Sequence, residues 1–252
     1  MPSPFLSLII PCYREAERLP STIKSLLSWK ETFPHSLEVI LVIEPSPDET
    51  LDVARSLANT HEWMTVIENE QRLGKGGTVA HGMKQANGEW RAFCDADGAT
   101  DFSFFTQVFS QTPLPSIIIA SRAHPQSQLI PKQPFFRQLT GLLFRYATRL
   151  ITHLPYPDTQ CGCKVFHHTL VPILFEPLQE QGFAMDVELL LKARRLQEPV
   201  LELPCIWRDQ PGSTVHPIQD GLRMLTTLIR LRKQLIRKER LALESQHLSS
   251  YE

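Results

Sequence analysis

The sequence predicts an α/β fold with a mostly parallel, Rossmann-like central sheet. Three observations support this prediction: apolar strand-like runs alternate with helix-like segments over the first 120 residues, their spacing suits consecutive βαβ units, and polar loops follow several of the runs. In such sheets, ligands bind beyond the carboxyl ends of the strands. With 252 residues, 42% of them hydrophobic, the chain is long enough to bury a large core.

The first half of the chain contains the clearest elements. Strands are predicted where apolar and β-branched residues run together, and the first of them stops at Pro11, which has no amide hydrogen to donate. Helices are predicted where apolar residues recur three or four positions apart. In chain order the prediction is a strand over 5–10, a helix over 19–29, a strand over 37–43, a helix over about 50–59, a strand over 65–67, a helix over 76–86, and strands over 89–94 and 116–120.

The alternation weakens after residue 121. We predict loops over 122–134 and 155–164, helices over 135–154 and 185–196, and a strand over 200–206. Residues 1–215 would form the main domain, and residues 216–252 a C-terminal amphipathic helix and tail. That last helix, from Gly221 to about Glu244, would either lie on anionic lipid or pack on the core or in a dimer with a solvated basic face. Its basic residues are Arg223, Arg230, Arg232, Lys233, Arg237, Lys238 and Arg240.

Composition narrows the classes of function. A formal net charge of -1 argues against general nucleic-acid binding, so no nucleic-acid partner is expected. The five cysteines form no disulfide framework, which suits a reducing cytoplasm. We see no signal peptide and no apolar run long enough to span a bilayer. The expected location is cytoplasmic, with any membrane contact made peripherally from the cytoplasmic face.

A pair of carboxylates follows the strand predicted over 89–94. Asp95 and Asp97 are two residues apart in the run from Cys94 to Gly98. Two such carboxylates at the end of a buried strand are costly unless a cation lies between them. Oxygen ligands suit Mg²⁺ or Mn²⁺, and these metals suit a pyrophosphate. The alternative is an ordinary turn closed by Asp97 and Gly98.

Two further polar loops are predicted at the same edge of the sheet. Residues 11–15 follow the first strand, and residues 44–46 follow the second. The carboxyl ends of parallel strands meet at one edge, so these loops and residues 95–97 should converge. The convergence favours a nucleotide-binding crevice over an isolated turn.

Six stretches resemble a known family in their order and spacing. Residues 7–15, 69–77 and 95–100 resemble the inverting family-2 glycosyltransferases. Three later stretches, at 120–124, 158–164 and 183–190, are similar to the dolichyl-phosphate β-glucosyltransferase branch, to which the dolichyl-phosphate mannosyltransferases are related. The resemblance covers about residues 5 to 215. It implies the GT-A fold and the metal-dependent transfer of a hexose, here glucose from UDP-glucose, to a polyprenyl or dolichyl phosphate.

The resemblance also implies roles for individual residues on the donor side. Asp95 and Asp97 would hold Mg²⁺ or Mn²⁺ on the donor pyrophosphate, where the metal neutralises charge on the leaving group. Arg72 and Lys75 lie in a glycine-containing turn that can approach phosphate oxygens. The residues expected to bind the nucleotide sugar are Pro11, Tyr13, Glu15, Glu44, Arg72, Lys75, Asp95 and Ala96.

On the acceptor side, the resemblance assigns the acceptor phosphate to Arg122 and Arg137, and Gln160 and Lys164 would border it. The alternatives are a surface-loop role for Arg122 and a helix-face role for Arg137 over apolar neighbours. Asp158 and Asp186 complete the expected catalytic set, and Glu188, two positions after Asp186, is expected to face solvent. A competing hypothesis for the loop is a zinc site of Cys161, Cys163, His167 and His168, although its ligand spacing is unusual.

Departures from the family pattern keep two other functions open. Where the family has Asp-Asp-Gly-Ser after the second strand, this chain has the run from Ile43 to Ser46, with Glu44 as its single acid. The nucleoside contact and base preference are therefore open. The alternatives are a transferase acting on a soluble or glycan hydroxyl, and a catalytically silent module that binds nucleotide sugars. A phosphate acceptor is already ionised near neutral pH and needs no general base, unlike a hydroxyl.

Overall fold

The structure is a computed structural model of the whole chain. It describes residues 3–130, 135–176, 178–210 and 224–234, and within the helix that starts at residue 135 the side chains are described from residue 141 onward. Seven strands form one sheet in the order β3-β2-β1-β4-β7-β5-β8, and two short strands, β6 and β9, pair separately. The strands are β1 Leu6–Cys12, β2 Leu37–Ile43, β3 Met64–Glu68, β4 Trp90–Cys94, β5 Ile117–Ser121, β6 Gln128–Ile130, β7 Cys163–His167, β8 Val200–Pro204 and β9 Ile206–Arg208.

All pairings in the large sheet are parallel except those of β7, which runs antiparallel between β4 and β5. The expected mostly parallel α/β fold is therefore confirmed. Strands β1 and β2 are apolar almost throughout, as strands buried on both faces must be. The helices are α1 Leu19–Lys30, α2 Thr50–Ala58, α3 Gly74–Gln85, α4 Ser103–Phe109, α5 Phe135–Thr152, α6 Val171–Phe175 and α7 Met185–Arg195, with a short 3-10 turn over His168–Leu170.

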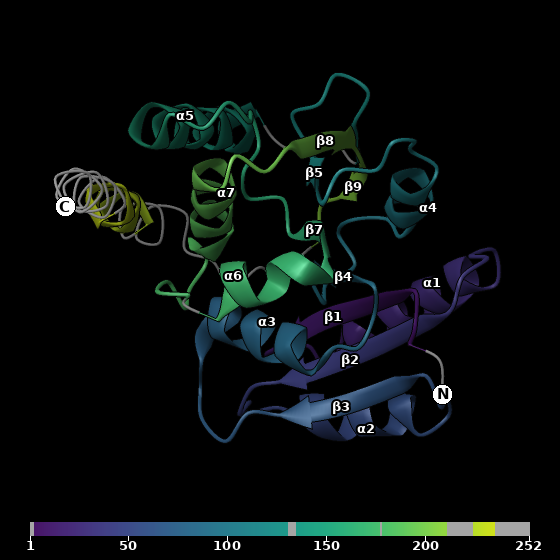
Figure 1. Cartoon of the computed structure of the whole chain (residues 1–252). Helices are drawn as coiled ribbons and strands as arrows, with labels where there is room; N and C mark the ends of the chain where they lie inside the picture. Colours follow the sequence, from purple (N-terminus) through teal and green to yellow (C-terminus); the bar gives the residue numbers. More distant parts are fainter. Residues whose placement is uncertain (1–2, 131–134, 177, 211–223, 235–252) are drawn as a thin grey trace, which may run out of the picture.

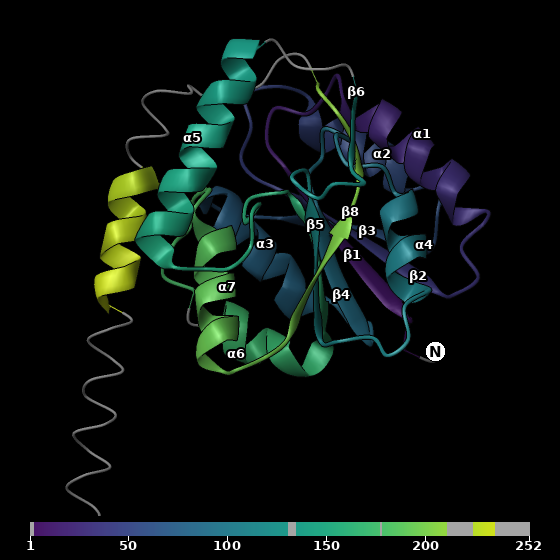
Figure 2. The ribbon, with the colours of Figure 1, turned by 90° about the horizontal axis from the view of Figure 1, so that it is seen from above.

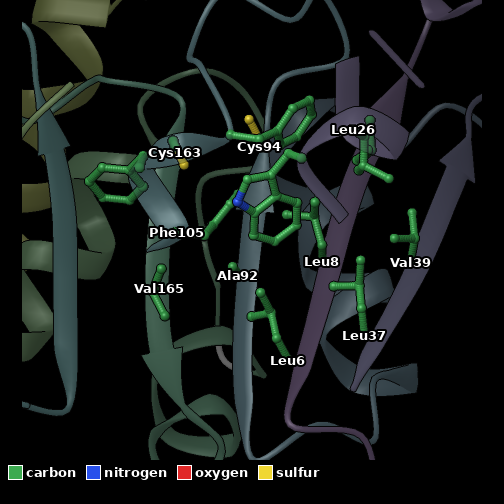
Figure 3. Close-up of a cluster of buried hydrophobic side chains, with 14 of the residues drawn as sticks. Leu6, Leu8, Leu26, Leu37, Val39, Ala92, Cys94, Phe105, Cys163 and Val165 are labelled. Carbon is green, nitrogen blue, oxygen red and sulfur yellow. The ribbon is translucent and has the colours of Figure 1, made fainter. Parts of the chain in front are cut away.

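Helices cover both faces of the sheet (Figures 1 and 2). On one face α1, α2 and α4 enclose an apolar cluster in which Leu26 and Phe105 pack toward Leu8 and Ala92 of the sheet (Figure 3). On the other face α3, α6 and α7 enclose a second cluster around Phe93 and other buried side chains. The sheet thus lies in the middle of three layers, as its apolar strands require.

Most predicted elements are present with shifts of one or two residues at their ends. The loop predicted over 122–134 contains the short strand β6, and residues 163–167, split between a predicted loop and unassigned sequence, form β7. Helices α4 and α6 were not predicted, because seven and five residues are too few for a clear periodic pattern. The strand predicted over 200–206 is divided into β8 and β9.

The last helix is described only over residues 224–234, which are helical. There Leu228 and Leu231 are buried against the second apolar cluster, so this part packs on the core. The predicted boundary at residue 215 and the predicted helix beyond residue 234 lie outside the described residues. In the part of the chain that the structure describes, no helix combines the length and apolar character that crossing a membrane requires.

Candidate functional site

A cleft of about 300 Å³ lies at the carboxyl ends of β1, β2 and β4. It is where the three polar loops were expected to converge. The side walls come from the start of α3 and from the segment before α7. Its lining contains all eight residues predicted to bind the nucleotide sugar together with the second predicted metal ligand, namely Pro11, Tyr13, Glu15, Glu44, Arg72, Lys75, Asp95, Ala96 and Asp97.

The two predicted metal ligands lie beside a partly buried lysine. Lys75 Nζ is 2.6 Å from Asp95 Oδ1. Asp97 accepts a hydrogen bond from the Ala99 amide at 2.9 Å. Burial raises the pKa of Asp97, and the neighbouring negative charge of Asp95 raises it further. The pair therefore carries negative charge that its surroundings only partly compensate.

This donor set fits a divalent cation that is shared with a substrate. Among the described residues, no group of three or more metal-ligating side chains is arranged to hold an ion by itself. Mg²⁺, however, usually keeps several waters and is bound through one or two carboxylates together with substrate phosphates. Asp95 and Asp97 supply two carboxylates of that kind at the edge of an open cleft.

Gly162 packs directly against the carboxylate of Asp95. A Cβ atom at this glycine would lie 1.8 Å from Asp95 Oδ2, a separation that no side chain can adopt. The backbone joins the same two residues, since the Asp95 amide donates to the Gly162 carbonyl at 3.1 Å. The loop before β7 therefore fixes the position of Asp95, the first predicted metal ligand.

We expect Gly162→Ala to displace Asp95 and to weaken Mn²⁺ binding in the presence of nucleotide by about tenfold or more, because one misplaced ligand of this kind costs at least 1.4 kcal/mol. Calorimetry of the variant with Mn²⁺ and UDP would measure the effect. Gly141→Ala is a matched control, because its added Cβ would meet only the Arg145 side chain at 3.6 Å. Unchanged Mn²⁺ affinity in the folded Gly162→Ala variant would contradict the prediction.

Glu15 lines the cleft but is already paired. Arg18 donates to both of its carboxylate oxygens, at 2.8 and 2.6 Å. Burial raises the pKa of Glu15 to about 7; Arg18 opposes this rise, and the charges of Asp97 and Asp95 add to it. Arg18 was not among the predicted residues, although its position three residues after Glu15 at the start of a helix is a signal for such a pair.

Glu44 is buried at the end of β2 and anchors the turn before α3. Its Oε1 accepts hydrogen bonds from the Leu73 amide and the Thr78 hydroxyl, both at 2.8 Å. Thr78 also accepts from Asn69 at 3.1 Å, and Asn69 in turn contacts His81. A continuous hydrogen-bond chain therefore sets the orientation of Glu44.

Arg72 closes one side of the same part of the cleft. Its guanidinium carbon lies 4.0 Å from the centre of the Tyr13 ring, within cation–π distance. Its Nε is 3.8 Å from Glu44 Oε2. An aromatic face, a cation and a carboxylate thus converge where a nucleoside was expected.

The predicted acceptor residues surround a second ion pair. Arg122 donates to both oxygens of buried Asp158, at 2.7 and 2.8 Å. Burial favours the neutral form of Asp158, but Arg122 outweighs it and lowers the pKa of this carboxyl. Burial lowers the pKa of Arg145 on α5; Asp158 opposes the shift and Arg122 adds to it, which places Arg145 within electrostatic range of the pair.

The other predicted acceptor residues are placed differently. Gln160 donates from its backbone amide to Asp158 at 3.3 Å, and its side chain contacts Met224. Arg137 belongs to α5, but its side chain lies outside the described residues. Lys164 is fully buried, and its ammonium donates to Asp186 at 2.5 Å and to the Cys161 carbonyl at 2.7 Å.

One expectation for this region is wrong, and one competing hypothesis is not supported. Glu188 does not face solvent: it is 3% exposed and accepts hydrogen bonds from the Gln179 and Glu180 amides. The sequence spacing suggested opposite helix sides, but both Asp186 and Glu188 are buried in the first turn of α7. The zinc hypothesis also fails, because within the described part of the chain its four residues do not form a metal-binding group.

The structure adds residues that the sequence analysis missed. Gly182 and Phe183 line the cleft from the segment before α7, and Thr78 lines it from α3. A larger cavity of about 540 Å³ lies between α3 and α6, and its described lining contains none of the predicted site residues. Geometry and charge both favour the smaller cleft as the functional site.

Comparison with known proteins identifies the family of this chain. The model of the family described as "Glycosyl transferase family 2" matches residues 7–170. The chain is 36% identical over 237 residues to a dolichyl-phosphate beta-glucosyltransferase of Drosophila melanogaster, covering 88% of this chain and 73% of that protein. It is 31% identical to the Homo sapiens protein of the same name, over 92% of this chain and 76% of that protein.

Solved structures share the fold at lower identity. Mannosyl-3-phosphoglycerate synthase from Rubrobacter xylanophilus gives a TM-score of 0.67 at 19% identity, over 94% of this chain and 75% of that one. Glucosyl-3-phosphoglycerate synthase from Mycobacterium tuberculosis, crystallised with Mn²⁺, UDP and phosphoglyceric acid, gives a TM-score of 0.66 at 15% identity. The match covers 92% of this chain and 78% of that one. These neighbours confirm the expected GT-A architecture.

Proposed function

Since the chain belongs to glycosyl transferase family 2 and is a glycosyltransferase, we propose that it transfers glucose from UDP-glucose to dolichyl phosphate or another polyprenyl phosphate. The product would be a β-linked lipid-phosphate sugar, as the names of the relatives indicate for those proteins. The observation that carries the proposal is the cleft that brings nine predicted donor-site residues together at one edge of the sheet.

The donor half of the proposal rests on the charges of the cleft. Tyr13, Arg72 and Glu44 would bind the nucleoside, offering a ring face, a cation and a fixed carboxylate. Lys75 would contact the phosphates from the first turn of α3, where backbone amides also favour anions. Related folds crystallised with UDP fit this arrangement.

Asp95 and Asp97 would hold Mg²⁺ or Mn²⁺. When bound, such a cation supplies Lewis-acid neutralisation of the charge that develops on the leaving diphosphate. The chain's own contribution is to fix both carboxylates, one through Gly162 and the other through the Ala99 amide. Lys75, whose ammonium lies next to Asp95, would contact the phosphates as well.

On the acceptor side, the proposed reaction needs positive charge to bind the acceptor phosphate more than it needs a general base. A phosphate monoester is largely dianionic at neutral pH, because its second pKa is about 6. Arg122, whose Nε and Nη2 are held by Asp158, would contribute positive charge on the acceptor side, and Arg145 lies within electrostatic range. Arg137 would contribute a further positive charge from α5. Lys164 and Asp186 are buried and paired with each other, so they would stabilise the loop over residues 155–164 rather than contact the lipid.

A membrane surface is the natural source of such an acceptor, and α5 offers a surface to meet it. Leu142, Leu143, Tyr146 and Leu150 follow one face of this helix and are all more than half exposed, Leu143 at 59%. Exposed Arg149 lies between them in sequence, which suits anionic headgroups. We propose that the protein docks peripherally through this apolar face of α5.

The docking proposal predicts that Leu143→Asp reduces binding to vesicles of phosphatidylserine and phosphatidylcholine about tenfold or more. Removing a leucine side chain that becomes buried in lipid costs roughly 1.5–3 kcal/mol of binding free energy, and the added negative charge repels anionic lipid. Vesicle sedimentation measures the effect. Ile173→Asp is a matched control, because Ile173 is 50% exposed on α6, away from α5 (Figure 1). Equal binding of both variants would exclude α5 as the docking surface.

A donor and acceptor screen tests the function itself. Purified protein would be incubated with Mn²⁺ and radiolabelled UDP-glucose or GDP-mannose, with a short-chain prenyl phosphate, 3-phosphoglycerate or no acceptor. We expect label in the organic phase only with UDP-glucose and prenyl phosphate together. Transfer only to 3-phosphoglycerate would replace the lipid acceptor by a soluble one. UDP binding without transfer to any acceptor would instead indicate a silent nucleotide-sugar module.

A further inference from the structure

We propose that Lys75 is an internal counter-cation of the donor cleft, which occupies Asp95 while the cleft is empty and must release it before a divalent cation binds. This inference rests on the proposed function, because it concerns the order in which metal and nucleoside diphosphate enter the same cleft. It makes Lys75 a determinant of metal affinity in addition to a phosphate contact.

The contacts of Lys75 carry the inference. Its Nζ is 2.6 Å from Asp95 Oδ1, and the side chain is only 15% exposed. Asp186 and Asp97 lie within electrostatic range of the same ammonium. The lysine therefore serves as a counter-ion to several carboxylates at once.

The backbone around Lys75 is fixed, so only its side chain can move between Asp95 and the phosphates of a bound nucleotide. Gly74 adopts a φ of +72°, a conformation that suits glycine, and the Gly76 amide donates to the Gln181 carbonyl at 2.7 Å. The ring of Phe183 lies 6.0 Å from Nζ on the side of α7. The four-carbon stem of a lysine can move its charge by several ångströms without moving this backbone.

The Lys75 ammonium lies 2.6 Å from an oxygen of Asp95. A divalent cation bound to the same carboxylate would lie close to this ammonium, and the two positive charges would repel each other strongly. A divalent cation that arrives alone must compete with an ammonium that already neutralises Asp95. A nucleoside diphosphate changes the balance, because its phosphates give Lys75 a new anionic partner. Metal and nucleotide should therefore each strengthen the binding of the other by the same factor.

Electron paramagnetic resonance of free Mn²⁺ tests this without any turnover. Wild-type protein should bind Mn²⁺ weakly alone and more tightly with UDP. Lys75→Met should bind Mn²⁺ alone about tenfold more tightly than wild type, and the strengthening by UDP should shrink. Lys75→Arg, which keeps the charge, should retain the weak binding of Mn²⁺ alone.

The controls separate this inference from the proposed function. Lys84→Met removes an exposed lysine from the same helix, on the side of the other cavity, and should leave Mn²⁺ affinity unchanged. The inference is overturned if Mn²⁺ and UDP bind to wild type but Lys75→Met binds Mn²⁺ alone no more tightly, or if Lys75→Arg or Lys84→Met tightens it equally. If wild type binds neither Mn²⁺ nor UDP, the proposed donor site fails as well.

Discussion

Asp95→Asn is expected to lower the rate of glucose transfer by about a thousandfold, because a metal at the leaving group supplies several kcal/mol of charge stabilisation and each 1.4 kcal/mol is a factor of ten. The amide keeps the size of the carboxylate and leaves Gly162 its space. It removes the charge that would bind the cation and that pairs with Lys75. Turnover with saturating UDP-glucose and Mn²⁺ measures the loss.

Asp186→Asn is the matched comparison for this variant. Asp186 is buried against Lys164 and would contact no reacting atom, so its substitution should cost much less turnover per folded molecule than that of Asp95. Circular dichroism would establish the folded fraction of each variant. Equal loss of turnover in the two variants would argue for a general base and against a phosphate acceptor.

Lys164→Met should destabilise the fold by about 3–5 kcal/mol, the range found when one partner of a buried ion pair is removed. Lys164 is 0% and Asp186 is 2% exposed, so the substitution leaves a buried carboxylate without its cation. The carbonyl of Cys161 loses the same donor. Urea denaturation of both proteins would measure the difference in unfolding free energy.

Two further variants identify the cause of that loss. Replacing both partners, in Lys164→Met with Asp186→Leu, removes the isolated charge and should recover much of the stability. Lys192→Met should cost less, because its partner Glu188 keeps backbone donors from Gln179 and Glu180. A Lys164→Met protein with the unfolding midpoint of wild type would show that this pair contributes little.

The fold was predictable where the sequence is periodic. Strand β2 is present over the predicted residues, and β1 and α1 differ only by small shifts at their ends. Strand β7 escaped prediction because Lys164, a charged residue, stands inside it. Besides the hydrogen bond to the nearby Cys161 carbonyl, the burial of Lys164 depends on its pairing with Asp186. That partner is 22 residues away and leaves no local signal.

That the proposed donor-site residues line one cleft was predictable, because they follow strands and share one edge of the sheet. The roles of side chains that depend on contacts with residues distant in the sequence were not predictable. Arg122 could be assigned to the acceptor side by resemblance, but its fork is held by Asp158, 36 residues away. Glu188 looked exposed by helical spacing, yet the chain folds back so that two backbone amides reach its carboxylate. Contacts of this kind arise only in the folded chain.

The late position of β7 in the chain has a consequence for synthesis of the protein. Strand β4 pairs with β7 residue by residue from Trp90 with His167 to Cys94 with Cys163. A ribosome must therefore make about 70 residues after β4 before that strand gains its second neighbour. Until then the nascent chain exposes an unpaired apolar edge, the kind of edge on which chains aggregate. The loop whose Gly162 contacts Asp95 is made just before β7, so the proposed metal ligand gains this contact only when that part of the chain has been synthesised.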